Sequence, residues 1–507
     1  MKTDGIANRH LLASDGLQDS GQAEEQSIRI VVADRWASSL AGQLLASCLV
    51  NLLCRQVRLV RHIEVVAVDT PVLIKLPYGD SNNRFPMCLT SIAKWAVDDA
   101  VSVTTSQTEA IVDHTVFIGE TQTTTCRGHR LLAVGDGWRA WVGDPSHASP
   151  SVPPNSPNPL GPFLAAALTA GEIFKRSRGI RRGRFLSADG YSLWSGASSQ
   201  NWMDLHEGPE ISGTLLSPTH LVGAGAVGNA LAYIIANLGL ASGYFVLIDD
   251  DYYDDTNLNR CLVAGWSDIG HHKVYAIERA LNAGRIEAFS FPGTIRSYVK
   301  DGRVGLRADV AQQIDDLVFS VVLSCVDKGA ARQDVQGLHP RLLLGGSTFN
   351  LQAKSNLYSG RPGAACLACF NPAEKDGEEI RTLEDQLRRM PDHDRREFLT
   401  ARGLDVAALE EYLSGAQCGR LGEAALRDFV VRPPAEFSAG FVSLGSGLLL
   451  ASALLRSTIF SIDTSARGDM TTLNFLNGGF GDSRLGADDN CRLNYGARHM
   501  NRFSDRR

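Results

Sequence analysis

Residues 215–251 read LLSPTHLVGAGAVGNALAYIIANLGLASGYFVLIDDD, in which two apolar runs flank a glycine-rich turn and an apolar helical pattern. The turn carries Gly223, Gly225 and Gly228 in the spacing Gly-x-Gly-x-x-Gly. A strand, a turn, a helix and a second strand form a βαβ unit, whose crossover makes the two strands parallel. Glycine lets the main chain approach a phosphate closely, and the helix N-terminus supplies unpaired N–H groups. The segment therefore predicts an α/β fold with a nucleotide site at the turn.

The residues after this unit are polar and spaced in a definite series. The second strand ends at Asp249, whose carboxylate can accept hydrogen bonds from ribose hydroxyls. Up to this point an NAD-dependent oxidoreductase and an ATP-using enzyme fit equally well. The chain then continues as DDYYDDTNLNR to Arg260, reaches Lys273, and later reads SCVDKGAAR with Asp327.

This complete series resembles the ubiquitin-activating enzyme superfamily, whose simplest bacterial members are ThiF and MoeB. The resemblance covers the second half of the chain in register. It implies that Asp249 binds the ribose of ATP, and that Asp327 binds Mg²⁺ or orients the attacked α-phosphate. It also implies that Asn257, Arg260 and Lys273 hold the triphosphate and neutralise it, because a carboxylate that attacks a phosphate must overcome like-charge repulsion.

Several nearby residues carry other expectations. Asp251 and Asp255 are expected to be solvated or to cap a helix. Cys261 stands where the family usually has glutamine, and we assign it no role. The cysteines that lie in or beside apolar patterns are expected in the core: Cys48, Cys54, Cys88 and Cys325.

Three further cysteines raise the question of zinc. Cys366 and Cys369, in RPGAACLACFNP, match the first half of the structural zinc site that is common in these enzymes. A structural zinc ion takes four ligands. Near the C-terminus only Cys491, in CRLNYG, is found, with Asn494 where a partner cysteine would stand. Three thiolates with another ligand such as histidine, a remnant without metal, and plain packing all stay open.

Cys418 stands apart from the other cysteines, in AQCGRLGEAAL just before an expected helix. In the family, a Cys-x-x-x-Gly stretch at this place can supply the nucleophile that forms a thioester. Nearby N–H groups and Arg420 would lower the pKa of its thiol and raise the thiolate fraction. A small buried cysteine is the alternative interpretation.

The first half of the chain repeats the outline of the second without its glycine turn. Strand patterns at 27–33 and 63–68 enclose a helical pattern at 36–57, with ADRWAS at the turn. The two halves close on similar helices, GPFLAAALTAGEIF and GLLLASALLRSTIF. We therefore predict two Rossmann-like ThiF-type adenylation domains, an inactive one and then an active one, forming an intramolecular pseudo-dimer. Some family members receive an arginine from the partner copy, and Arg35 is the nearest candidate.

The expected domain boundaries follow from these patterns. We expect a disordered N-terminus at 1–26, the inactive domain at 27–200, the first part of the active domain at 201–372, a helical insertion with the catalytic cysteine at 373–425, and the C-terminal part of the active domain at 426–507.

Composition excludes several classes of protein. The chain has 507 residues, and 50 Lys and Arg against 56 Asp and Glu give a net charge of −6. This balance disfavours sequence-independent nucleic-acid binding, which needs a basic surface. The longest apolar run, at 448–455, is shorter than the ~18 residues of a membrane span, and the polar start shows no signal-peptide core. Ten cysteines in so long a chain fit reduced thiols in a cytoplasm.

These observations together predict an activating enzyme for a ubiquitin-like β-grasp protein, with ATP and Mg²⁺ and an open question of Zn²⁺. The partner's C-terminus would be adenylated, transferred to Cys418 as a thioester and passed to a conjugating enzyme. Bacterial conjugation operons, some of them linked to phage defence, encode proteins of this type. One alternative is adenylation of a sulfur carrier or a peptide without conjugation. Others are an NAD-dependent oxidoreductase and a non-catalytic scaffold, and the pseudo-dimer could act alone or as a homodimer.

Overall fold

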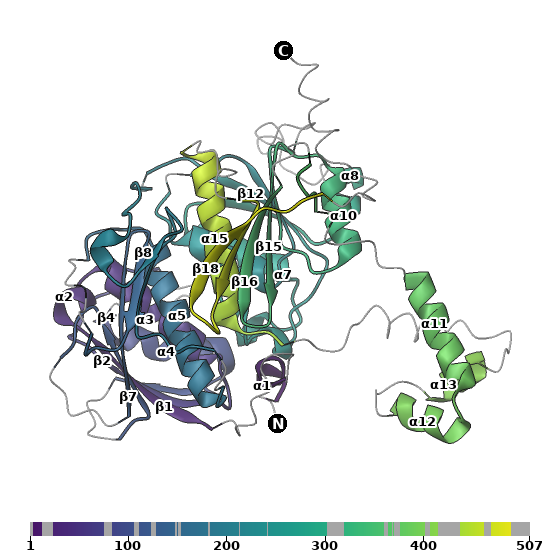
Figure 1. Cartoon of the computed structure of the whole chain (residues 1–507), viewed down its shortest axis with the longest axis horizontal. Coiled ribbons are helices and arrows are strands. Elements are labelled where there is room, and N and C mark those ends of the chain that lie inside the picture. The colour runs from purple at the N-terminus through teal and green to yellow at the C-terminus, as the bar shows by residue number, and fades with distance from the viewer. Residues whose placement is uncertain are drawn as a thin grey trace, which may run out of the picture. The chain divides into compact units, whose positions relative to one another are not determined.

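The computed structural model divides the chain into two compact units (Figure 1). One unit contains residues 1–371 together with 437–507, and the other contains residues 372–436. The structure describes residues 4–12, 24–75, 84–105, 111–122, 128–147, 150, 154–180, 183–211, 213–240, 242–301, 319–358, 363–367, 369, 376–400, 406–413, 437–460 and 468–487.

The second half of the larger unit is built on an eight-stranded sheet. Its strands lie in the order β13 (Glu287–Phe291), β12 (Tyr244–Ile248), β11 (Thr219–Val222), β14 (Val321–Ser324), β15 (Leu342–Phe349), β16 (Gln352–Tyr358), β17 (Met470–Asn474) and β18 (Gly479–Ser483). The strands from β13 to β15 pair in parallel, and those from β15 to β18 pair antiparallel. Both β11 and β14 are buried along their length, as expected for strands with helices on both faces.

The first half has a sheet of the same size and order. Its strands are β5 (Ser102–Thr104), β2 (Val60–Val66), β1 (Gln26–Val32), β6 (His114–Ile118), β7 (His129–Asp136), β8 (Arg139–Gly143), β9 (Ala188–Ser192) and β10 (Ser198–Ser199), beside a small pair of β3 (Thr70–Pro71) and β4 (Arg84–Phe85). When the sheet strands of each half are numbered along the chain, both sheets read 3-2-1-4-5-6-7-8. The predicted duplication of an α/β domain is thus confirmed, and the order 3-2-1-4-5 is that of a Rossmann-like fold.

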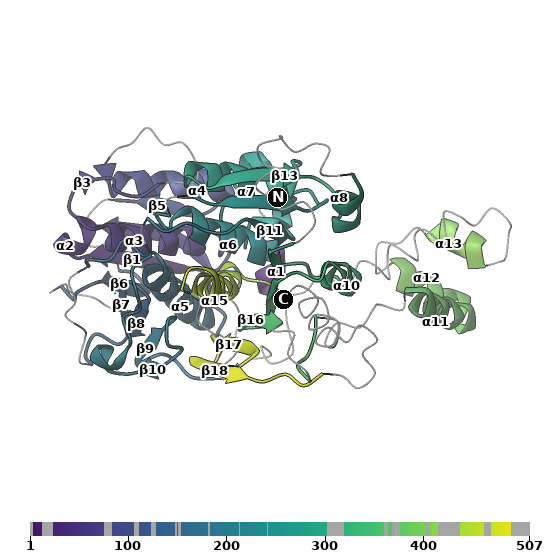
Figure 2. The same cartoon turned by 90° about the horizontal axis from the view of Figure 1, so that it is seen from above.

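Helices join the two halves through a single core. The first half contributes α1 (Asp4–Leu11), α2 (Asp34–Ala37), α3 (Leu40–Cys54), η1 (Met87–Leu89), α4 (Thr90–Val97), α5 (Leu160–Ser177) and η2 (Trp202–Asp204). The second contributes α6 (Ala226–Ala236), η3 (Asp255–Asn257), η4 (Trp266–Asp268), α7 (Lys273–Ala283), α8 (Ile295–Asp301), α10 (Gly329–Gly337) and α15 (Gly440–Thr458). Helix α5 packs on the first sheet, α15 packs on the second, and the two helices pack against each other (Figure 2). The Phe163 ring of α5 also stacks on the Tyr233 ring of α6 in the second half, with centroids 4.9 Å apart.

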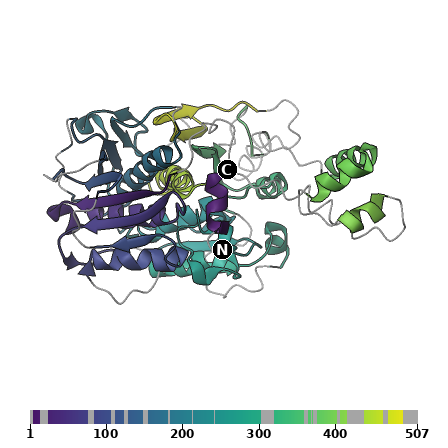
Figure 3. The same cartoon turned by 90° about the horizontal axis from the view of Figure 1, so that it is seen from below.

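Two expected elements differ in the structure. The predicted helix at 36–57 is divided into α2 and α3, because Ser39 accepts a hydrogen bond from the Gly42 N–H at 3.0 Å and so caps a new helix. The first 26 residues are not wholly disordered, since residues 4–11 form α1, the purple helix beside the N-terminus in Figure 3. This helix packs against η3, with Ile6 and Ala7 buried. Burial of these apolar side chains orders a helix too short to be stable alone.

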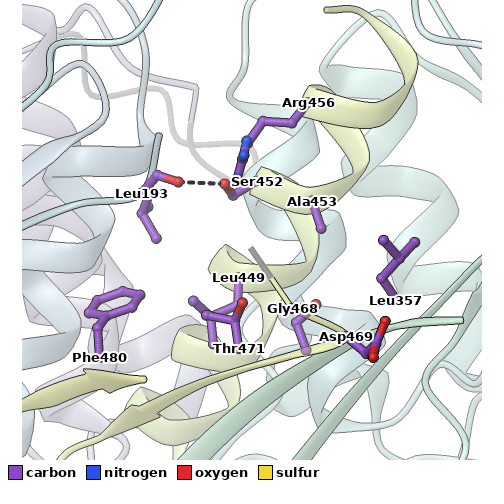
Figure 4. Close-up of a pocket in the computed structure, with 11 residues that line it drawn as sticks. Leu193, Leu357, Leu449, Ser452, Ala453, Arg456, Gly468, Asp469, Thr471 and Phe480 are labelled. Carbon is purple, nitrogen blue, oxygen red and sulfur yellow. Dashed lines mark hydrogen bonds between the residues drawn. The ribbon is translucent and has the colours of Figure 1, made fainter. Parts of the chain in front are cut away.

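Helix α15 is the one helix, among the described residues, with the length and apolar composition to cross a membrane. Its apolar window is 89% buried, which accounts for that composition by packing in the core. A cavity of about 40 Å³ lies beside it where the halves meet, and Ser452 donates a hydrogen bond there to the Leu193 carbonyl at 2.8 Å (Figure 4). Its lining contains none of the predicted nucleotide residues.

The smaller unit contains the helices α11 (Asp376–Arg389), α12 (Asp392–Thr400) and α13 (Val406–Leu413). They share a small core of four buried leucines, Leu387, Leu399, Leu409 and Leu413. This agrees with the helical character expected of the insertion. The unit spans residues 372–436, and Cys418 lies outside the described residues.

Candidate nucleotide site

The topology locates a crevice at the carboxyl ends of β11 and β14. The chain leaves β11 toward β12 on one side and returns to β14 on the other, and ligands of open α/β sheets bind where the strand order reverses in this way. The glycine turn follows β11, Asp249 follows β12, and Asp327 lies three residues past β14. The predicted residues therefore gather at one edge of the second sheet.

The structure gives a different reason for glycine at each of the three positions of the turn. Gly223 has a φ of +99°, and a Cβ there would lie 2.6 Å from the Cys325 carbonyl carbon. A Cβ on Gly228 would lie 2.1 Å from the Gly223 oxygen, so this glycine lets α6 approach the turn. A Cβ on Gly225, the residue just before α6, would meet nothing within 4 Å. Gly225 thus faces open space at a helix N-terminus, where an anion can be bound.

Asp249 closes the turn from the neighbouring strand. Its Oδ2 accepts a hydrogen bond from the Ala224 N–H at 2.6 Å, and its Oδ1 accepts one from the Asp251 N–H at 2.8 Å. Burial raises the pKa of Asp249, although the Lys273 charge and the two N–H donors oppose the shift. The carboxylate therefore stands within the glycine turn, in the place expected for a ribose acceptor.

Lys273 is the first residue of α7 and points back toward this edge. Its Nζ donates to Asp251 Oδ2 at 2.9 Å, and its main-chain N–H donates to the Asp251 carbonyl at 3.0 Å. Burial opposes the charge of both groups, but their mutual attraction outweighs burial, so the pKa of Asp251 is lowered and that of Lys273 is raised. The Asp251 side chain is 63% exposed, so it is solvated as expected, and it is also the ion-pair partner of Lys273.

The Asn–Leu–x–Arg segment forms η3 and the turn after it. Asn257 is buried, and its Oδ1 accepts from the Asp254 N–H at 3.4 Å. The Arg260 guanidinium donates to the Thr256 carbonyl at 2.5 Å and to Asn259 Oδ1 at 2.8 Å. Burial lowers the pKa of Arg260, and the nearby Arg9 charge adds to this, while Asp327 acts in the opposite direction. These effects place Arg9 and Asp327 in the electrostatic surroundings of Arg260.

A second arginine near Arg260 comes from the N-terminal segment, which was expected to be disordered. Arg9 belongs to α1, and its carbonyl accepts from the Ser438 N–H at 3.2 Å just before α15. His10 bonds through Nε2 to the Val57 carbonyl at 2.9 Å and lies 3.5 Å from Asn259 Nδ2 through Nδ1. Sequence reasoning missed Arg9 because the polar start of the chain was expected to be disordered. The apolar residues of DGIANRHL were the available signal.

Arg35 lies at the corresponding turn of the first half. It stands three residues past β1, as Gly225 stands three residues past β11, and it forms an ion pair with Glu120. Trp36 beside it is fully buried, and a Cβ on Gly119 would lie 2.0 Å from the Trp36 ring. An indole thus fills the crevice that is open in the second half. Arg35 is bound within its own half, which does not support its expected role.

The structure describes the cysteines predicted in the core and the first pair of the zinc candidates, but not Cys418 or Cys491. Cys48, Cys54, Cys88 and Cys325 are all buried, as predicted for core residues. Cys366 Sγ and Cys369 Sγ lie 3.6 Å apart, and the Cys366 N–H donates to Cys369 Sγ at 3.3 Å. The segment beside them pairs with the C-terminal region, since the Ala365 N–H donates to the Leu485 carbonyl at 3.0 Å. Cys491 and Cys418 lie outside the described residues.

Comparison with known families agrees with this geometry. The ThiF family matches residues 216–493, and the BilD N-terminal domain matches residues 27–187. The site and topology define a pair of α/β adenylation-type domains, one with an open crevice and one with a filled crevice. Because the ThiF match spans more than half of the chain, the chain belongs to the ThiF family, within the E1-like superfamily.

Individual relatives are distant. The chain is 25% identical over 368 residues to "Uncharacterized protein y4jF" of Sinorhizobium fredii (strain NBRC 101917 / NGR234), covering 72% of this chain and 64% of that protein. It is 27% identical over 236 residues to "Bacterial E1-like protein BilD" of Collimonas sp. (strain OK412), covering 46% of each. The chain thus spans between about half and two thirds of these relatives. The crystal structure of E. coli MccB with ATP is 14% identical with a TM-score of 0.34, over 55% of this chain and 65% of that one.

Proposed function

We propose that this chain is an ATP-dependent adenylating enzyme that activates the C-terminal carboxylate of a protein substrate. The observation that carries the proposal is the placement of Asp249, Lys273 and Asp327 at the carboxyl edge of the second sheet, around an open glycine turn at the reversal point, with Arg260 in the segment between Asp249 and Lys273. An NAD-dependent oxidoreductase would need the glycine turn and the strand-end acid, but would have no use for the basic pair. Membership of the ThiF family also favours adenylation.

Each residue of the edge has a role in this reaction. Asp249 accepts hydrogen bonds from the ribose, and Gly225 leaves room for phosphate at the N-terminus of α6. Arg260 and Lys273, with Asn257, bind the triphosphate and reduce its negative charge. Asp327 would hold Mg²⁺, which neutralises phosphate charge when bound. A substrate carboxylate oxygen then attacks the α-phosphorus, and pyrophosphate leaves with the electrons of the broken P–O bond.

Arg9, and not Arg35, is the proposed arginine that reaches the ATP site from outside the second domain. Helix α1 packs on η3, and the Arg9 charge acts on Arg260. A second cation beside Arg260 would add to the positive potential that attracts the triphosphate. We therefore infer that the arginine supplied from outside the second domain comes from the N-terminal helix of the same chain.

The second step uses Cys418. Its thiolate attacks the acyl carbon of the adenylate, AMP leaves, and a thioester results. A ubiquitin-like β-grasp protein is the proposed substrate, and a conjugating enzyme is the proposed acceptor. If the substrate is a sulfur carrier or a peptide that needs no thioester, the first step alone would occur.

Cys366 and Cys369 are the proposed first pair of a zinc site. Thiolates bound to one tetrahedral zinc ion at ~2.3 Å lie about 3.8 Å apart, and the observed separation is 3.6 Å. This distance is far longer than the ~2.05 Å of a disulfide. The pairing of residue 365 with residue 485 leads the chain toward Cys491, the proposed third ligand. Zinc here would tie the C-terminal segment to the sheet and would take no part in adenylation.

The test is ATP–pyrophosphate exchange with small β-grasp proteins encoded beside the gene. Lys273→Ala should lower exchange at least a hundredfold, because it removes a cation that stabilises the transferred phosphate. Lys94→Ala alters an exposed lysine of α4 in the first half and should leave exchange unchanged. Cys418→Ala should keep exchange and lose the thioester, which is seen as a band sensitive to reducing agent.

The outcomes separate the candidate functions. Exchange without any thioester in the parent protein would favour the sulfur-carrier or peptide substrate. No exchange with any candidate, together with measurable NAD binding, would overturn adenylation in favour of the oxidoreductase.

A further inference from the structure

Arg55 is a fully buried arginine that crosses from the first half into the second. It caps the C-terminus of α3, and its Nε donates to Asn51 Oδ1 at 2.8 Å. Its two terminal nitrogens donate to the main-chain carbonyls of Leu258 at 2.6 Å and Ala264 at 2.8 Å. The guanidinium carbon also lies 5.3 Å from the Trp95 ring centroid. No carboxylate is among these contacts, so carbonyl dipoles and an aromatic face compensate the buried charge.

Asn51 adds a third bond to the same segment. Its Nδ2 donates to the Leu262 carbonyl at 3.1 Å, while its Oδ1 holds Arg55. The two side chains therefore fix three carbonyls within residues 258–264, the turn that contains Arg260. Trp95 closes the end of this turn, since a Cβ on Gly265 would lie 2.4 Å from its indole nitrogen.

Other contacts of this turn lie mostly within the second half. The N–H groups of Arg260 and Cys261 both donate to the Asn257 carbonyl at 3.1 Å, and Asn259 Nδ2 donates to the Ser438 carbonyl at 2.8 Å. From the second half, Asn229 Oδ1 accepts from the Val263 N–H at 2.8 Å. Arg260 itself is held by residues of its own turn, Thr256 and Asn259. The direction of the Arg260 side chain therefore depends on the path of the main chain between Leu258 and Ala264. Arg55 and Asn51 bind three carbonyls along this path.

We propose that Arg55 and Asn51 are positioning residues, through which the first half sets the geometry of the Arg260 turn and thereby the affinity of the second half for MgATP. The proposal deepens the function proposed above and rests on it for the identity of the nucleotide. It gives the first half, whose own crevice is filled, a direct part in the nucleotide site.

The test compares Arg55→Met with Arg184→Met in the full chain. Arg184 is the control, because it also crosses between the halves and donates to the carbonyls of Asn477 at 3.2 Å and Gly478 at 3.1 Å, although it is more exposed than Arg55 and also pairs with Asp189. Those carbonyls belong to the turn between β17 and β18, away from the Arg260 turn. We expect Arg55→Met to raise the Kd for MgATP at least tenfold, and Arg184→Met to change it less than twofold. Asn51→Ala, a smaller change, should raise the Kd three- to tenfold if Arg55→Met does not fold.

Two further measurements separate positioning from general weakening of the fold. In an Arg260→Ala background, Arg55→Met should raise the Kd for MgATP less than threefold, because the residue it acts through is gone. Hydrogen exchange without nucleotide should show amides 258–264 exchanging at least tenfold faster in Arg55→Met and unchanged in Arg184→Met.

The results distinguish this proposal from the proposed function. If the parent chain shows no MgATP binding that Lys273→Ala abolishes, the proposed function fails, and hydrogen exchange still decides whether Arg55 holds the turn. If the parent binds MgATP and both arginine variants bind it within twofold of the parent, or if exchange at 258–264 is unchanged, the positioning role is overturned.

Discussion

At the scale of single residues, the glycine turn shows that one motif serves two purposes. Gly223 and Gly228 are required by the fold, because side chains there would collide with main-chain atoms of Cys325 and of Gly223 itself. Gly225 meets no such limit, and its hydrogen atoms face open space at the start of α6. The sequence pattern alone could not separate these reasons. In the structure, only Gly225 among the three leaves open space, where the proposed phosphate would lie.

Alanine at the two positions should therefore have different effects. Gly228→Ala places a methyl group 2.1 Å from a carbonyl oxygen, and we expect it to lower the free energy of unfolding by about 2 kcal/mol or more. Gly225→Ala should change that free energy by less than about 1 kcal/mol, yet raise the Kd for MgATP at least tenfold. Urea unfolding and a MgATP titration measure the two quantities. Parent-like MgATP affinity in Gly225→Ala would show that phosphate does not approach this residue.

The cysteine pair also makes a prediction at this scale. If Cys366 and Cys369 bind zinc, the purified chain should contain about one zinc ion per molecule, measured by elemental analysis after exhaustive dialysis. Cys369→Ser should remove most of it, since a structural site needs its full set of ligands. Cys88→Ala, at a buried cysteine of the first half, should keep the metal. A parent chain without zinc would favour a remnant or plain packing.

At the scale of elements, the docking of α1 involves a titratable side chain, His10, beside the bond that Arg178 donates to the Leu11 carbonyl at 3.0 Å. Burial, aided by the Arg178 charge, lowers the pKa of His10 to about 4, although its bond to the Val57 carbonyl opposes the shift. A proton on Nδ1 would also face the amide group of Asn259. Since an undocked His10 takes up its proton near its ordinary value of 6.5, docking of α1 is at full strength above that pH and weakens as the pH falls toward 4.

Acidification should therefore release α1 before the rest of the unit unfolds. The pKa difference corresponds to at most about 3 kcal/mol of docking free energy, lost between pH 6.5 and 4. Hydrogen exchange of amides 4–11, measured as a function of pH and corrected for intrinsic rates, should show protection falling in this range. His10→Gln removes the titration, so its protection should depend far less on pH. Equal pH dependence in the two proteins would rule out His10 as the sensor.

At the scale of the whole molecule, the sequence predicted what depends on local pattern and missed what depends on distant contacts. Both βαβ units and the placement of Asp249 and Asp327 at one edge follow from strand order, since parallel strands end at the same edge. Helix α1 has only a weak local signal in the apolar residues of DGIANRHL, because its order comes from burial against residues some 250 positions away. Arg55 carries no sequence signal for the same reason, as its carbonyl partners leave no mark in residue identity.

The whole molecule should bind one MgATP, although it contains two domains of the same topology. In the first half, Trp36 is fully buried at the turn, and β2 is followed by Ala67 and Val68, while the next residue, Asp69, pairs with Arg84. Equilibrium dialysis should give one MgATP per chain, and Lys273→Ala should abolish it all. Trp36→Gly should create no second site, because the acid directly after the strand is missing and the one cation placed at this turn, Arg35, is paired with Glu120. It should instead lower the free energy of unfolding by about 3–5 kcal/mol, the cost of an emptied tryptophan site. Two equivalents of MgATP in the parent, or binding that survives Lys273→Ala, would contradict the division of the pseudo-dimer into an active and an inactive domain.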